Sequence, residues 1–238
     1  MAIKACLALI TLLLTGCAQR APGLTVAAAS NLSPAFEEAG AEFTQQTGIP
    51  VVFSYAATAV LARQVSESAP FDVFAAADTI HLDQLVEAGY IESRAIFARG
   101  QLALWVPGSA APALEDLAKP EIRFVSIAQP ELAPYGAAAV EALKAAGLWE
   151  AVRPKLVYTS NINQAKQLAA SGNADAAFTA YSLVMRESGA VVRVHGSIEQ
   201  AIGIVARSPH REAAVRFTEF VLSRRGQEIL ARNGYLAP

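Results

Sequence analysis

The stretch Leu24-Thr25-Val26-Ala27-Ala28-Ala29-Ser30-Asn31-Leu32-Ser33-Pro34 predicts a strand that runs through a short polar turn into a helix. Its first six residues form an apolar run, which is typical of a buried strand. Ser33 followed by Pro34 matches a helix start, with a capping residue and then proline in the first helical position. Apolar residues recur at helical spacing as far as Gly48, where we expect the helix to end.

Strand and helix patterns alternate along the rest of the chain. Further strands are expected at 51–55, 72–76, 101–106, 123–128, 155–158, 176–179, 191–194 and 201–206. Further helices are expected at about 58–66, 80–88, 136–145, 161–170, 211–222 and 225–232. This alternation predicts an α/β protein with mostly parallel sheets covered by helices on both faces.

The N-terminal segment predicts export. A positive start at Lys4 precedes an apolar run, which ends in Leu14-Thr15-Gly16-Cys17. The run is too short for a stable transmembrane helix, and we interpret residues 1–16 as a secretory signal peptide. Its end resembles the bacterial lipobox, which implies cleavage before Cys17 and lipidation of that residue. We therefore expect a lipidated tether at 17–23 and a protein on the periplasmic side of the cell envelope, attached to the membrane only through its lipid.

Composition excludes several classes of protein. Cys6 is the only other cysteine and lies in the predicted signal peptide, so the mature chain has no disulfide and depends on its core for stability. The formal net charge is −2 and basic residues form no run, which argues against nucleic acid as a partner. The sequence has no Gly-x-Ser-x-Gly, phosphate-loop or His-Glu-x-x-His motif, so we expect no catalytic residues and no cofactor.

Four strand-to-helix turns share one chemical character. They contain Ser30-Asn31, Ala56-Ala57-Thr58-Ala59, Pro134-Tyr135-Gly136 and Asn161-Ile162-Asn163. Each places backbone N–H groups at a helix start, where the helix dipole favours an anion, and none contains a charged residue. A carboxylate ligand is typically held by arginine, and a protonated anion needs an acceptor carboxylate. A site of neutral donors therefore predicts a fully deprotonated tetrahedral dianion.

Simpler interpretations of these residues remain open. Asn161 and Gln164 have the spacing of a capping pair, and Thr58 is also a residue type that caps helices. Asp78 and His81 are three apart and offer the alternative of a secreted metal-dependent hydrolase. The chain has no further His or Cys near this pair, so we expect no bound metal cation and favour a helix-start charge for Asp78.

Six segments spread over nearly the whole chain form a characteristic combination. They are residues 26–32, 61–65 and 72–78, the turn 134–136, residues 172–176 leading into Phe178, and residues 226–230 followed by Gly234-Tyr235. In this order they resemble the periplasmic molybdate-binding proteins of ABC importers.

The resemblance implies a type II periplasmic-binding-protein fold of two α/β lobes with a hinge, expected at 24–103 plus 204–238 and at 104–203. It implies a monomer that holds molybdate or tungstate in the cleft as an oxyanion and delivers it to an ABC transporter permease. The positions that match the family's ligand contacts are Ser30 and Asn31 (side chain and N–H), Thr58 (hydroxyl and N–H), Tyr135 (N–H and ring hydroxyl) and Ile162 (N–H).

The sequence departs from the family pattern at two places. Some members bind the anion with a tyrosine where this chain has Ala180, so it resembles the branch with tyrosine in the Pro-Tyr-Gly turn. The family's second turn is usually rich in Gly and Ser, whereas Thr58 is the only hydroxyl residue in Ala56-Ala57-Thr58-Ala59. This difference leaves sulfate or another tetrahedral oxyanion open as the ligand.

Overall fold

The computed structural model describes residues 23–108, 113–194 and 196–238. The predicted signal peptide and Cys17 lie outside the described residues. Within these ranges, no helix combines the length and the apolar character needed to cross a membrane.

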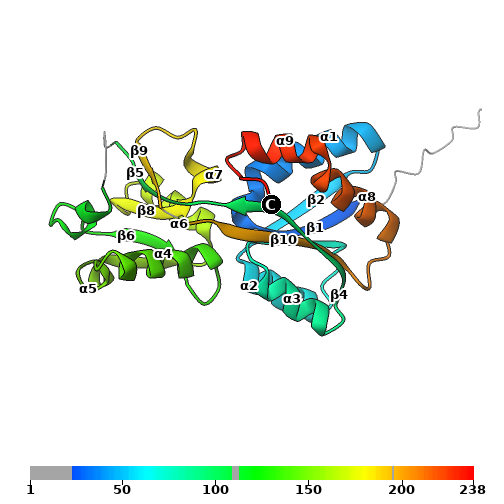
Figure 1. The fold of residues 1–238 in the computed structure, drawn as a ribbon, viewed down its shortest axis with the longest axis horizontal. Coiled ribbons are helices and arrows are strands. Elements are labelled where there is room, and N and C mark those ends of the chain that lie inside the picture. The colour runs from blue at the N-terminus through cyan, green and yellow to red at the C-terminus, as the bar shows by residue number, and fades with distance from the viewer. Residues whose placement is uncertain (1–22, 109–112, 195) are drawn as a thin grey trace, which may run out of the picture.

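The chain forms two five-stranded sheets that lie side by side (Figure 1). The strand order of the first sheet is β2 (Val51–Ala56), β1 (Leu24–Ala29), β3 (Val73–Ala76), β10 (Ile198–Val205) and β4 (Ile91–Gly100). The order of the second is β7 (Leu156–Thr159), β6 (Val125–Ala128), β8 (Ala176–Ala180), β5 (Leu102–Val106) and β9 (Ala190–Arg193). We call the first sheet with its helices the first half, and the second sheet with its helices the second half.

Both sheets have the same plan. Three strands pair in parallel, β2-β1-β3 in the first half and β7-β6-β8 in the second. The remaining two strands of each sheet pair antiparallel, β10 and β4 in the first half and β5 and β9 in the second. The predicted two-part α/β fold is confirmed, and the sheets are mixed because β10 in the first sheet and β5 in the second run antiparallel to the other strands.

Helices cover both faces of each sheet. In the first half, α1 (Ser33–Thr47), α8 (Arg211–Leu222) and α9 (Arg224–Arg232) lie on one face, and α2 (Thr58–Ser66) and α3 (Ile80–Glu87) on the other (Figure 1). The second half contains α4 (Pro134–Ala145), α5 (Trp149–Val152), α6 (Ile162–Ala170) and α7 (Tyr181–Val184). Short 3-10 helices lie at Ser30–Leu32 (η1), Leu114–Ala118 (η2) and Arg153–Lys155 (η3).

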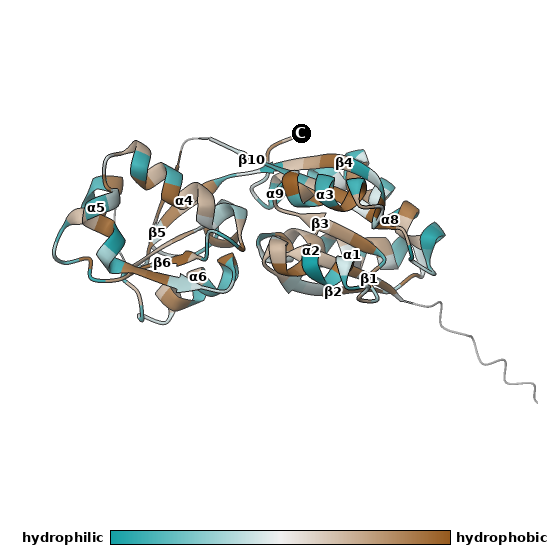
Figure 2. Ribbon diagram, turned by 90° about the horizontal axis from the view of Figure 1, so that it is seen from below, coloured by the Kyte–Doolittle hydropathy of each residue, from teal (hydrophilic) through white to brown (hydrophobic). Residues whose placement is uncertain are grey.

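A cluster of phenylalanines packs α1 and α8 of the first half against each other. Phe36 and Phe43 of α1 and Phe217 of α8 are nearly or fully buried, and their rings pack at centroid distances of 5.3–6.1 Å. Such offset and edge-on pairs are favoured by the quadrupole of the ring. Hydrophobic residues are concentrated on the strands in the middle of each half (Figure 2). Each half therefore has a core that can hold the ends of its strands in place.

The chain passes between the halves at two places, from β4 to β5 around Gln101 and from β9 to β10. The lobe boundaries expected from the sequence, at 103/104 and 203/204, fall inside β5 and β10. The strand β4 was not expected at all, although it runs beside β10 along most of the first half. These two strands form the connection that positions one half against the other.

Candidate functional site

The five residues predicted to bind the ligand line one small cavity between the halves. Ser30, Asn31, Thr58, Tyr135 and Ile162 are at most 4% exposed. The other lining residues are Ala29, Ala56, Ala57, Ala77, Ala133 and Pro134. The cavity therefore lies at the carboxyl ends of β1, β2 and β3 on one side, and after β6 and β7 on the other, where ligands of α/β sheets commonly bind.

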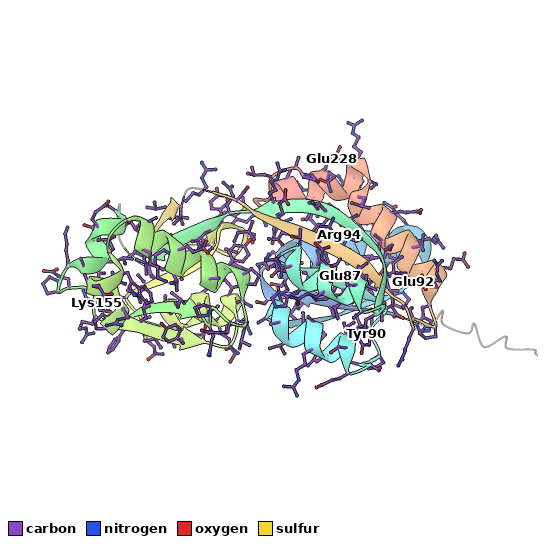
Figure 3. The ribbon with its side chains drawn as sticks, turned by 60° about the horizontal axis from the view of Figure 1, so that its bottom comes forward. Glu87, Tyr90, Glu92, Arg94, Lys155 and Glu228 are labelled. Carbon is purple, nitrogen blue, oxygen red and sulfur yellow. The ribbon has the colours of Figure 1, made fainter. Side chains whose placement is uncertain are left out.

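The described lining of this cavity contains no charged side chain. Charged groups such as Glu92, Lys155 and Glu228 lie instead on the outside of the two halves (Figure 3). Small alanine side chains account for much of the lining, so the polar groups that face the space are mainly backbone N–H groups and hydroxyls. This composition suits a compact ligand that carries its own negative charge.

Helix starts converge on the cavity, and most of them lack a capping side chain. No side-chain cap is present at η1, α2 or α4, whose cap positions are held by alanines. The first N–H groups of a helix have no acceptor within the helix, so an external acceptor is needed. Thr58 is the first residue of α2 and not its cap, which removes the capping explanation for this residue.

The fourth helix start, that of α6, is capped in the way the sequence predicted. Asn161 accepts a hydrogen bond from the Gln164 N–H at 3.0 Å, and the Gln164 side chain accepts one from the Ser160 N–H at 3.1 Å. The N–H groups of Ser160 and Gln164 are therefore satisfied within the protein. Ile162, the first residue of α6, lines the cavity.

Thr58 accepts a hydrogen bond that orients its side chain and leaves the hydroxyl hydrogen free to be donated to a ligand. The Ala77 N–H donates to Thr58 Oγ1 at 3.1 Å. Because this bond uses the oxygen as an acceptor, the hydroxyl hydrogen can point toward the cavity. The single hydroxyl of the alanine-rich turn is thus held in place by the end of the neighbouring strand, β3.

The side chains of Asn31 and Tyr135 are used mainly within the protein. Asn31 Nδ2 donates to Gln200 Oε1 at 2.9 Å and to Tyr235 Oη at 3.0 Å. Tyr135 Oη accepts from Gln200 Nε2 at 2.9 Å, and burial raises the pKa of this phenol well above its usual value. At these two positions the backbone N–H groups, and not the side chains, are therefore the candidate donors to a ligand, as at the other helix starts.

The halves touch each other at the edge of the cavity. The Ala59 N–H, in the first turn of α2, donates to the Leu132 carbonyl of the second half at 3.1 Å. Leu132 was not anticipated from the sequence, because it is an apolar residue in a loop and contributes only its backbone. This bond holds the two sets of helix starts around the same space.

The pair that suggested a hydrolase has a structural role at the start of α3. Asp78 accepts from the His81 N–H at 3.0 Å and pairs with His81 Nδ1 at 2.7 Å, and this hydrogen bond raises the pKa of the His81 imidazole. No group of three or more His, Cys, Asp or Glu residues that could hold a metal ion occurs among the described residues. Larger hollows, such as that beside His210 and Arg216, lie on the outer surface and share no residue with the cavity.

The comparison with known proteins agrees with this geometry. A family model described as "Bacterial extracellular solute-binding protein" matches residues 24–236. The curated "Molybdate-binding protein ModA" of Rhodobacter capsulatus is 36% identical, with 91% of this chain and 89% of the relative covered. The chain belongs to the ModA family of bacterial extracellular solute-binding proteins.

Further relatives support the same placement of this ModA-family chain. The molybdate-binding protein of Azotobacter vinelandii is 34% identical, with 93% of each chain covered. The solved structure titled as the Azotobacter vinelandii periplasmic molybdate-binding protein superposes with a TM-score of 0.86 at 28% identity, over 90% of this chain and 99% of that one. The structural likeness therefore extends over both halves of the chain.

Proposed function

We propose that this chain is an extracytoplasmic solute-binding protein, without catalytic activity, that captures molybdate or tungstate and delivers it to an ABC transporter permease. The observation that carries the proposal is the convergence of four helix starts on one small cavity without charged side chains in its described lining. The names of the ModA relatives support the choice of molybdate among tetrahedral oxyanions.

The proposed donors are the backbone N–H groups of Ser30, Asn31, Thr58, Tyr135 and Ile162, together with the hydroxyls of Ser30 and Thr58. A tetrahedral dianion offers four acceptor oxygens, and hydrogen bonds to a charged partner contribute about 1.5–3 kcal/mol each. Together such bonds amount to roughly 10–21 kcal/mol before the cost of association, compared with the roughly 8 kcal/mol of net free energy that corresponds to micromolar affinity.

The proposed mechanism is closure of two lobes on the anion. The two lobes are the first half and the second half, with the site shared between them. Ser30, Asn31 and Thr58 come from the first lobe, and Tyr135 and Ile162 from the second. Neither set surrounds the anion alone, so the bound anion stabilises the closed arrangement by its higher affinity for that state.

A titration with molybdate, tungstate, sulfate and phosphate tests the ligand assignment. Molybdate or tungstate at 100 times its dissociation constant should raise the free energy of unfolding by about 2.7 kcal/mol. Sulfate should stabilise less at equal concentration, because its shorter bonds bring its oxygens less close to donors on both halves at once if the halves close to fit the larger anion. Equal stabilisation by sulfate would show that the molybdate assignment is wrong. Thermal unfolding and calorimetry provide the two measurements.

We further propose export and anchoring through Cys17, with the protein acting as a monomer. The Leu14-Thr15-Gly16-Cys17 segment directly after the apolar run supports this proposal. The protein should fractionate with membranes when expressed in bacteria, and the Cys17→Ser variant should not carry the lipid. Mass spectrometry of the mature N-terminus is the direct check. An unmodified mature N-terminus at another residue contradicts the anchoring.

A further inference from the structure

A buried polar network lies beside the anion cavity, at the junction of the halves. Its members are Asn31, Tyr135, Ser182, Gln200 and Tyr235, all at most 8% exposed. Of these, Asn31 and Tyr135 belong to the proposed site, whereas the other three do not line the cavity. Buried polar side chains are costly unless their hydrogen bonds are satisfied, so a network of this size indicates a specific arrangement that the fold maintains.

Gln200 joins one ligand turn from each half. Its Oε1 accepts from Asn31 Nδ2 in η1 of the first half, and its Nε2 donates to Tyr135 Oη in α4 of the second half, both at 2.9 Å. The side chain is fully buried. One amide group therefore fixes the distance between two helix starts that face the same anion.

The backbone around Gln200 is shaped to direct this side chain into the junction. Gln200 pairs with Ala98 of β4, but Ala201 pairs with Ile96, so Phe97 is an extra residue at a β-bulge. Bulges change the direction of neighbouring side chains, and they are common beside functional sites. Gly100, at the end of β4, lies against the same contact. A Cβ atom at Gly100 would lie 1.9 Å from Tyr135 Oη and 2.3 Å from Gln200 Nε2.

A second set of contacts holds the Asn31 peptide from both halves. The Asn31 carbonyl accepts from Tyr235 Oη at 2.7 Å and from Ser182 Oγ of α7 at 3.0 Å. Ser182 belongs to the second half, whereas Tyr235 lies near the C-terminus in the first half. The next peptide group toward the N-terminus carries the Asn31 N–H, so this anchoring orients a proposed ligand donor.

These contacts can form together only when the halves are close. Separation of the halves would break the bond from Gln200 to Tyr135 and the bond from Ser182 to Asn31. A network satisfied in only one arrangement favours that arrangement over the open one. We propose that Gln200 is a positioning residue that couples closure of the halves to the placement of the Asn31 and Tyr135 helix starts at the anion. This inference rests on the proposed oxyanion-binding function.

The test compares Gln200→Met with a control, Thr47→Val. Thr47 Oγ1 also makes two hydrogen bonds, donating to the Phe43 carbonyl at 2.7 Å and accepting from the Ile49 N–H at 3.1 Å, but it lies at the end of α1 that is opposite to η1. Gln200→Met should raise the dissociation constant for molybdate about tenfold or more, mainly through faster release. Thr47→Val should lower the unfolding temperature and leave the dissociation constant within about twofold, because it touches neither the cavity nor the network.

Small-angle scattering measures the radius of gyration, which should not change if Gln200 only stabilises the fold. The radius of gyration of unliganded Gln200→Met should exceed that of the wild-type protein, and more molybdate should be needed to reduce it. Gly100→Ala should change affinity and radius in the same direction, because it displaces the Gln200–Tyr135 contact and removes no polar group. Wild-type affinity and wild-type radius in both variants would overturn the proposal.

The two hypotheses fail in different ways. If the wild-type protein binds none of the four oxyanions, the proposed function is wrong. The role of Gln200 in closure is then decided by the unliganded radius alone. If the wild-type protein binds molybdate and Gln200→Met binds it equally well, the positioning role is wrong and the proposed function stands.

Discussion

Replacing Ile162 with proline should weaken molybdate binding roughly 10- to 100-fold while leaving α6 folded, because the change deletes one backbone N–H at the anion. Ile162 is the first residue of α6, the position where proline is best tolerated in a helix. The preceding residue, Asn161, has φ −157° and ψ 169°, an extended conformation that is compatible with a following proline. The substitution is therefore close to a single-atom test of the proposed site.

The control for this prediction is Ile162→Ala, which keeps the N–H and loses apolar volume. Ile162 is 3% exposed, so both variants give up packing and both should unfold at a lower temperature than the wild-type protein. Only the proline variant should lose substantial affinity in a calorimetric titration. Equal dissociation constants for the two variants would show that the Ile162 N–H does not contact the anion.

Local sequence patterns were sufficient to predict most of the elements. The observed strand Leu24–Ala29 and the helix Arg211–Leu222 have the predicted bounds. Their apolar patterns are strong. The Ser33-Pro34 pair also marks the start of α1, but the capping role expected for Ser33 was wrong, because Ser33 is the first residue of the helix and Leu32 holds the cap position. The helix starts at the cavity were predictable for the same reason, because a strand-to-helix turn is encoded by adjacent residues.

The strand β4 was missed because its first part does not look like a strand. Glu92, Ser93 and Arg94 follow Ile91 and are all exposed, so the pattern is polar where a strand signal would be apolar. This segment is extended because it pairs with β10, a partner about 100 residues away, as in the pairing of Arg99 with Glu199. Contacts between distant segments leave no local periodicity to detect.

The network around Gln200 was beyond sequence analysis for a related reason. Its hydrogen bonds join residues separated by 65, 169 and 204 positions. Once β4 and its bulge are missing from the predicted fold, nothing in the sequence indicates where Gln200 points. The residues that face the anion were thus accessible from the turns, whereas the residues that hold those turns together required the tertiary structure.

Gly136→Ala should lower both the affinity for molybdate and the stability of the second half. A Cβ atom at this position would lie 2.1 Å from the Ala128 carbonyl oxygen and 2.9 Å from the Ala128 carbonyl carbon. Both contacts are with backbone at the end of β6, so no side-chain rotation relieves them. The first turn of α4 must then move away from β6, and the Tyr135 N–H moves with it.

Overpacking of this kind costs about 1–3 kcal/mol, which for a chain of this size lowers the unfolding temperature by roughly 2–12 °C. The dissociation constant should rise more than about tenfold, because a donor displaced by even 1 Å loses most of a charge-assisted hydrogen bond.

Gly23→Ala is the matched control, since its Cβ would make only ordinary contacts of 3.5 and 3.6 Å with Pro50. Both titrations are made at a temperature where the unliganded proteins are folded. Wild-type affinity in a destabilised Gly136→Ala protein would separate the packing of α4 from ligand binding, and would remove Tyr135 from the proposed site.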